Sequence, residues 1–403
     1  MTLTDLFAST TQMNPQAIAL SQAAGPAQPR RTLTYEAADR AIQRTMDHLL
    51  DLGLRPGEIV LVSMASTMEA PVAILAALRA GFTPCLVPVT VTLDEAASVV
   101  SAVPARAIVT TGAIGPLRPV EVLRAAAASS GGPRFVLAFG ERLPAGVIPL
   151  DDVLIRSADT GFEPVDAGMP QRPPAVLTVE RRAGRILVHR HEQSNLVAAS
   201  LLTVLRSGMA SAEPVLSTLS LMSLAGLVTG LGPCLLTAGT LALEPLFTTA
   251  SFLASLSAHP RLHVVVPGAL EGPLAESGLS ASVSIASALL LHRQGVRLDR
   301  VPGLPAARFP VVDALAVGER TLLVEARGED RRPALRLGTI RIPDDIGAIV
   351  VAARRHEDGQ LDVGGVTVST RLDENLRSDP EAFVGTGCSV TVDETQRILS
   401  VRN

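Results

Sequence analysis

The sequence contains no lysine. All 35 of the cationic side chains among its 403 residues are arginine. Arginine stays protonated in proteins, so it serves neither as a nucleophile nor as a general base. A Schiff-base lysine, a lysine general base and the lysine of a phosphate-binding loop are therefore excluded. Coding bias in a GC-rich genome replaces surface lysines without consequence, but it would normally spare a lysine that chemistry required.

Aromatic residues and cysteines are also scarce. The chain has no tryptophan, one tyrosine and three widely separated cysteines, Cys85, Cys234 and Cys388. Such cysteines form neither a disulfide framework nor a zinc site, so we expect free thiols in a reducing cytoplasm. The net charge is −4, and the arginine clusters lack the interleaved aromatic side chains on which bases stack. We therefore expect a cytoplasmic protein that binds no nucleic acid and no metal.

Apolar residues are abundant, at 47% of the chain, and 403 residues are enough for two or three packed units. No basic segment followed by an apolar core opens the chain, so we expect no signal peptide. Residues 216–243 are long and uncharged enough to span a bilayer, but glycines and a proline interrupt them. This pattern favours a buried helix that runs into a buried strand over a membrane span.

The first third of the chain alternates between helical and extended patterns. We expect helices over 35–52, 68–80 and 93–103, and strands over 59–63, 83–88 and 107–111. Alternation at this spacing predicts an α/β fold whose sheet is largely parallel and covered by helices.

The order of short motifs within this region is more specific than the alternation. The string from Leu33 to Pro88, LTYEAADRAIQRTMDHLLDLGLRPGEIVLVSMASTMEAPVAILAALRAGFTPCLVP, resembles the opening of the acyl-adenylate-forming, or AMP-binding, superfamily. That group includes acyl-CoA synthetases, adenylation domains of nonribosomal peptide synthetases and luciferases. The resemblance implies two helix-covered, largely parallel sheets plus a small C-terminal β-barrel, divided at 1–175, 176–310 and 311–403.

The same resemblance implies a phosphate loop of small residues near Thr178. The loop of the family resembles T-S-G-S-T-G-x-P-K-G, in which backbone N–H groups approach phosphate oxygens. Here the stretch reads TVERRAGR, from Thr178 through Gly184 to Arg185. A glutamate and bulky arginines replace the small residues. Arg185 could stand in electrostatically for the missing lysine, but solvated charge on a reshaped turn is the favoured interpretation.

Three further motifs match the family only in part. The adenine segment corresponds to 285–292, where aliphatic side chains replace glycines and would fill the space of the base. In the motif Y-G-x-T-E, Gly318 takes the place of threonine, and Glu319 matches the acid that contacts magnesium. In F-x-x-T-G-D, Thr386 is kept, but Cys388 replaces the aspartate that bonds the ribose hydroxyls. The chain also ends where the hinge of the family would begin, so we expect the C-terminal lid domain to be absent.

Two pairs of histidines are closely spaced. His189 and His191 would share a face of a strand, and His259 and His263 would share a face of a helix. Without a cysteine or acid placed to join them, two imidazoles are too few for a metal site, so packing or surface roles are expected.

These replacements affect the phosphate loop, the adenine segment and the ribose-binding acid together, while the apolar periodicity persists. We therefore interpret the chain as a pseudoenzyme that needs no cofactor and acts as a non-catalytic partner, regulator or scaffold of a biosynthetic enzyme or carrier protein. Homo-oligomers also fit this interpretation. The alternative is a divergent ligase half that activates a carboxylate with ATP and magnesium once a partner chain completes it, with Glu319 as its catalytic acid. Remnants of the nucleotide site would then be Thr178, Gly184, Arg185, Gly318, Glu319, Thr386 and Cys388.

Overall fold

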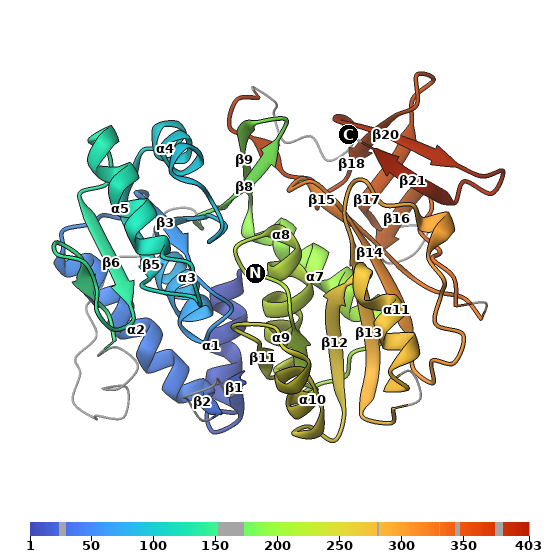
Figure 1. Cartoon of the computed structure of the whole chain (residues 1–403), viewed down its shortest axis with the longest axis horizontal. Coiled ribbons are helices and arrows are strands. Elements are labelled where there is room, and N and C mark those ends of the chain that lie inside the picture. The colour runs from blue at the N-terminus through green and yellow to red at the C-terminus, as the bar shows by residue number, and fades with distance from the viewer. Residues whose placement is uncertain are drawn as a thin grey trace. The chain divides into compact units, whose positions relative to one another are not determined.

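The computed structural model describes residues 1–23, 30–151, 173–279, 282–329, 331–342, 347–374 and 382–402. The chain forms two compact units (Figure 1). Unit 1 comprises Met1–Gln193, Ser220–Ser223 and Ala242–Phe252, and unit 2 comprises Ser194–Leu219, Leu224–Leu241 and Leu253–Asn403. The division into three subdomains at 1–175, 176–310 and 311–403 stays a prediction.

Unit 1 is built around a mostly parallel sheet. Its helices are α1 (Leu3–Met13), α2 (Tyr35–Asp51), α3 (Glu69–Arg79), α4 (Leu93–Ala102) and α5 (Pro119–Ser130). Its strands are β1 (Ile18–Gln22), β2 (Arg31–Thr34), β3 (Ile59–Ser63), β4 (Thr83–Leu86), β5 (Ala105–Thr111), β6 (Phe135–Phe139), β7 (Ile148–Pro149), β8 (Val176–Arg182) and β9 (Arg185–His191). The sheet has the order β9-β8-β4-β3-β5-β6-β7, in which only β9 is antiparallel to its neighbour. β1 and β2 form an antiparallel pair.

The elements expected in the first third are confirmed, with ends that differ by a few residues at most. Thr34 and Thr92 start α2 and α4 because their hydroxyls accept backbone N–H bonds from Ala37 and Glu95. Helices α4 and α5 pack side by side and share an aliphatic core with β3, β5 and β8. Buried aliphatic runs such as those of β3 and β5 are typical of parallel strands covered on both faces.

Unit 2 contains a second mostly parallel sheet and an antiparallel one. The helical segments are α7 (Gln193–Ser207), α8 (Leu224–Gly226), the π-turn η2 (Leu227–Leu231), α9 (Gly232–Thr237), η3 (Gly268–Leu270), α11 (Glu271–Glu276) and η5 (Leu298–Arg300). The strands are β10 (Val215–Ser217), β12 (Leu262–Pro267), β13 (Ile285–His292), β14 (Val311–Val317), β15 (Thr321–Ala326), β16 (Gly338–Ile342), β17 (Ala348–Arg355), β18 (Gln360–Gly364), β19 (Thr370–Arg371), β20 (Val384–Val392) and β21 (Ile398–Arg402). The bounds of β11 (Leu241–Leu243) and α10 (Thr249–Ser257) straddle the division between the units.

In the first of these sheets, β10, β12, β13 and β14 run parallel, and β15 adds antiparallel to β14. The second has the order β16-β17-β18-β20-β21, and all its neighbours are antiparallel. It curls into a half-barrel, because the amide of Leu337 bonds the carbonyl of Gln396 and the amide of Ile398 bonds the carbonyl of Leu335. The predicted fold class is thus confirmed.

The uncharged stretch 216–243 begins within β10, continues through α8, η2 and α9, and ends in β11. The helix that runs into a buried strand is confirmed, although the strand at the start of this stretch was not expected. Gly232 lies so close to α7 that an added Cβ would be 1.9 Å from the hydroxyl of Ser200. In the described part of the chain, none of the helices is both long and apolar enough to cross a membrane.

Candidate functional site

The predicted phosphate loop is a tight β-hairpin in unit 1. Strands β8 and β9 pair without interruption from Val176 opposite His191 to Arg182 opposite Arg185. Only Ala183 and Gly184 form the turn, and both have positive φ, at 46° and 73°, as a type I′ turn requires. Successive amides of a strand point in opposite directions, so this backbone offers no group of amides that converges on a phosphate.

Side chains at the base of this hairpin bond to one another. The hydroxyl of Thr178 lies 2.8 Å from Nε2 of His191, and both residues are fully buried. Burial, helped by the neighbouring His189, lowers the pKa of His191 to about 3, so that its imidazole is neutral. On the same face, Nε2 of His189 lies 3.0 Å from Oε2 of Glu180. The expected shared face of the two histidines is confirmed, and it faces the core.

Glu319 lies in unit 2, in the turn between β14 and β15, directly after Gly318, which has a φ of 57°. The Glu319 side chain is buried, and Oε2 accepts a 2.6 Å hydrogen bond from the backbone amide of Leu224, the first residue of α8. An acid at the start of a helix satisfies an amide that has no partner within the helix. The carboxylate that would contact magnesium in the family is therefore held by the backbone.

Cys388 is completely buried on β20 of unit 2. Its Sγ lies 2.9 Å from Nε2 of Gln294, and its amide donates to the hydroxyl of Thr386 at 3.1 Å. That hydroxyl in turn donates to the carbonyl of Leu361 at 2.6 Å. A thiol cannot replace a carboxylate that accepts two hydroxyl bonds, and here both side chains are used to join β20 to its surroundings.

Residues 285–292 form β13, a strand buried along its whole length between β12 and β14. The aliphatic side chains expected to fill an adenine pocket therefore belong to the central strand of a sheet. The expected helix that carries His259 and His263 is wrong, because His263 lies on β12. Its ring bonds Ser287 at 2.8 Å and Glu213 at 2.7 Å, which orient it between strands.

Unit 2 also contains a buried ionic cluster that no sequence motif indicated. Arg327 donates to Asp313 from Nε at 2.9 Å and to Glu271 from Nη2 at 2.9 Å. His292 Nε2 lies 2.8 Å from Asp313, and a Cβ added to Gly268 would be 2.4 Å from the His292 ring. Burial alone would raise the pKa of Asp313, but the bonds from His292 and Arg327 outweigh it and lower that pKa. An aspartate within the apolar strand Val311–Val317 was the available signal.

The predicted remnants of the nucleotide site thus fall into two groups. Thr178, Gly184 and Arg185 belong to unit 1, and Gly318, Glu319, Thr386 and Cys388 belong to unit 2. Among residues whose placement is described, no three His, Cys, Asp or Glu side chains gather to hold a metal ion. The hairpin backbone, the Glu319 carboxylate and the Cys388 thiol do not fit ATP and magnesium as the resemblance would place them. The role of these seven residues as nucleotide remnants stays a prediction.

Comparisons with known proteins agree with this fold. Residues 7–148 match the family model described as AMP-binding enzyme. No curated protein sequence matches the chain. Among solved structures, apo MbtA of Mycobacterium smegmatis has a TM-score of 0.79 at 18% identity, with 100% of this chain and 75% of that chain covered.

Two further structures contain an adenylate or an analogue. The anthranilate CoA ligase AuaEII in complex with anthranoyl-AMP has a TM-score of 0.75 at 15% identity, covering 99% of this chain and 77% of that chain. The N-terminal subdomain of NpsA from Klebsiella oxytoca, in complex with 3-hydroxyanthranilyl-AMSN, has a TM-score of 0.68 at 14% identity, with both chains covered in full. Identities this low show a shared fold only. Residues 7–148 thus match the AMP-binding family model, and the whole chain shares its fold with acyl-adenylate-forming enzymes.

Proposed function

We propose that this chain is a catalytically degenerate member of its superfamily that serves as a non-catalytic partner, regulator or scaffold of a biosynthetic enzyme or carrier protein. The observation that carries the proposal is the β8–β9 hairpin. Its ladder continues to a two-residue turn in the stretch that the sequence resemblance assigns to the phosphate loop. Phosphoryl and adenylyl transfer depend on positioning and on charge stabilisation, and a hairpin supplies neither.

Two other positions support the same proposal. Glu319 binds the first amide of α8, and Cys388 is buried against Gln294. Each side chain stabilises the fold of unit 2 and leaves a nucleotide without its acidic contact. The chain also has no lysine to stabilise charge at a reacting carboxylate. The chain keeps the apolar core of the fold but not the side chains that adenylation requires. Selection for binding another molecule best explains why such a fold is retained.

A divergent ligase half remains the alternative, and one observation favours it. Glu319 keeps the family position, in the turn directly after β14, so a rearrangement on binding a partner chain would free an acid for magnesium. This alternative requires the partner to supply the lysine and the phosphate contacts.

Calorimetry with the purified chain tests the first part of the proposal. Titration with ATP and magnesium, and separately with 3-hydroxyanthranilyl-AMSN, is expected to give no saturable heat up to millimolar ligand. The exposed Glu394→Ala variant serves as control for Glu319→Ala. Saturable binding that Glu319→Ala weakens at least about tenfold while Glu394→Ala does not would establish a nucleotide site and overturn the proposal.

Co-expression with the products of adjacent genes tests the partner role. We expect a stoichiometric complex by size-exclusion chromatography, with no ATP–pyrophosphate exchange beyond that of the partner alone. Exchange that appears only in the complex and disappears in Glu319→Ala would support the ligase half instead.

A further inference from the structure

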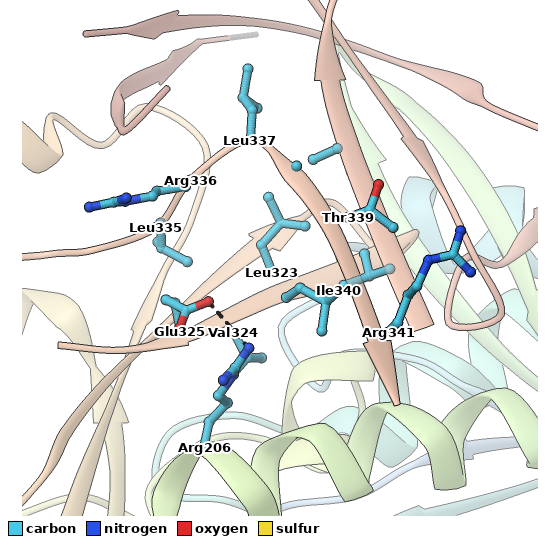
Figure 2. A pocket seen from close by; sticks show the side chains of 13 residues that line it. Arg206, Leu323, Val324, Glu325, Leu335, Arg336, Leu337, Thr339, Ile340 and Arg341 are labelled. Atoms are coloured by element: carbon cyan, nitrogen blue, oxygen red, sulfur yellow. Dashed lines mark ion pairs between the residues drawn. The ribbon is translucent and has the colours of Figure 1, made fainter. Parts of the chain in front are cut away.

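Unit 2 contains a cavity of about 510 Å³ outside the candidate nucleotide site (Figure 2). Its walls come from the C-terminal turn of α7, from β15, from β16 with the residues before it, and from β17. The lining residues are Arg206, 323–325, 335–341, Val351 and Ala353. None of them is among the residues predicted from the sequence to contact a nucleotide.

The pattern of lining residues shows which parts of the strands face the cavity. Val351 and Ala353 alternate along β17, so this strand presents one face. In contrast, 323–325 of β15 and 338–341 of β16 are consecutive, and side chains of consecutive residues point to opposite faces. The cavity therefore borders the backbone edges of β15 and β16. Each is the last strand of its sheet in the strand order. The residues just before β16 bond to those at the start of β21, but within the described residues no strand pairs with this edge of β16 from Gly338 on, or with the outer edge of β15.

Open strand edges expose rows of N–H and C=O groups that can pair with an added strand. Natural proteins usually cover such edges or twist them away. Here the two edges border one cavity, and buried apolar side chains, Leu323, Leu335 and Val351, line it between them. The strand edges offer backbone groups to which a peptide could bond, and the cavity offers room for every second side chain of that peptide. Recognition by strand addition requires both.

Charge specifies the occupant. Three arginines line the cavity against one acid, Glu325, which already pairs with Arg206 at 3.6 Å (Figure 2). Nε of Arg206 is buried, with no hydrogen-bond partner among the described residues. Arg336 is exposed, and Arg341 uses Nη1 to bond the carbonyl of Gly347, which leaves its other nitrogens as donors. The surplus positive charge is complementary to carboxylates.

We propose that this cavity binds an extended acidic peptide of a partner protein, which adds as a strand to the edge of β16 or β15. Arg336 lies two residues before β16 and Arg341 lies within it, so they are five residues apart, which is about 17 Å of extended chain. The peptide would therefore carry two acidic residues five positions apart, with apolar residues between them that face Leu323 and Leu335. The inference rests on the proposed partner role, and its site contains none of the residues predicted to contact a nucleotide.

A labelled peptide tests the proposal directly. The probe is fluorescein-labelled EVTVTE with capped ends, measured by fluorescence anisotropy on the whole chain at low and at physiological salt. The charge control is KVTVTK. Two N-methylated versions of EVTVTE test whether backbone hydrogen bonds contribute to binding. Each version has the amides along one edge of the peptide blocked, and neither changes the charge of the peptide. We expect saturable binding of EVTVTE, binding of KVTVTK at least about tenfold weaker, and a similar loss for one N-methylated version only.

Protein variants test the arginines. Arg336→Glu and Arg341→Glu should each weaken EVTVTE binding at least about tenfold, and Arg308→Glu, an exposed arginine outside the cavity lining, should not. Circular dichroism and thermal unfolding check that each variant folds, and the milder Arg336→Gln and Arg341→Gln replace any that does not.

Three results would overturn the proposal. They are equal binding of EVTVTE and KVTVTK, full binding by both N-methylated versions, and variants that lose no affinity. Self-association through the edge in sedimentation velocity, without peptide binding, would instead assign the arginines to protection of the edge or to contact between copies. Because no assay contains ATP, failure here leaves the nucleotide experiments unaffected.

Discussion

At the residue scale, Glu319 has a structural role. Its carboxylate satisfies the buried amide of Leu224 at 2.6 Å. Glu319→Ala should lower the free energy of unfolding by about 1–3 kcal/mol, because the amide is left without its partner. Glu319→Gln, which keeps an acceptor, should lose less, and the exposed Glu394→Ala should lose almost nothing. Urea denaturation measures all three, and an unchanged midpoint for Glu319→Ala would mean that the carboxylate has no role in stability.

His191 makes a second prediction, on pH. Its folded pKa of about 3 lies below the unfolded value of about 6.5, so the unfolded chain binds a proton that the folded chain does not. Stability from this group is present above pH 6.5 and is lost as pH falls toward 3, by up to about 1.4 kcal/mol per pH unit.

Comparing the pH dependence of stability in wild type and in His191→Gln separates the contribution of His191 from that of the titrating carboxylates. The stability of His191→Gln should fall less steeply than that of wild type between pH 6.5 and 4, whereas the exposed His356→Gln should follow wild type. Denaturant midpoints at half-unit pH steps measure both slopes. Parallel curves for wild type and His191→Gln would contradict the burial of a neutral imidazole.

The sequence could identify which site residues were replaced, but not what they would contact instead. That Cys388 stands where an aspartate is expected is visible in the motif itself. Its bond to Gln294 joins residues 94 positions apart, and the bond from Leu224 to Glu319 joins residues 95 apart. Contacts at such separations depend on the packed fold. The Arg327 cluster was missed for the same reason, since its members come from α11, β13, β14 and the residue that follows β15.

At the scale of elements, the hairpin turn offers a gain of stability. Ala183 has a φ of 46°, which strains a side chain with a Cβ, while Asn tolerates this region and Asn-Gly is the preferred type I′ pair. Ala183→Asn should therefore raise the free energy of unfolding, by an amount on the order of 0.5 kcal/mol. Ala183→Val should lower it, because a β-branched residue at positive φ is a true outlier. Thermal unfolding shows whether each variant is more or less stable than wild type. An Ala183→Val variant that is more stable than Ala183→Asn would exclude this turn type.

Elements with strong local signals were predicted well. The strand 59–63 agrees at both ends, because Arg55-Pro56-Gly57 sets its start and its aliphatic run is uninterrupted. The prediction of a helix that carries both His259 and His263 was wrong. Two residues four positions apart can lie on one helix, but here they fall after the end of α10 and within the strand that follows it. The order of motifs places the adenine segment of the family at 285–292, whereas the run of aliphatic residues there indicates a buried strand, and the structure has that strand as β13.

At the scale of the whole molecule, the chain keeps its buried apolar layers and pairs charged side chains within them. Unit 2 shows this most clearly. Its charged cluster joins α11, β13 and β14 to the residue after β15, and its members are all nearly inaccessible to solvent: Arg327, Asp313, Glu271 and His292. Such a cluster offsets its desolvation only while every member is paired. The integrity of unit 2 therefore depends on a charge network.

Arg327→Met tests that dependence. The substitution keeps much of the side-chain volume but leaves buried carboxylates without their cation, so it should lower the free energy of unfolding by about 3–5 kcal/mol at neutral pH. Arg297→Met, which breaks the surface pair with Asp299, is the matched control and should change little. Chemical denaturation measures both variants.

The pH dependence of the same variant separates charge from packing. In wild type, the pKa of Asp313 is lowered, so its contribution to stability is present above the unfolded value and is lost as pH falls. Without Arg327, burial raises that pKa, so the folded variant takes up a proton more readily than the unfolded one and is stabilised as pH falls. The difference in free energy of unfolding between wild type and Arg327→Met should therefore become smaller as the pH is lowered from 8 to 5. A gap that stays constant would mean that the loss comes from packing, and that the charge network does not hold unit 2 together.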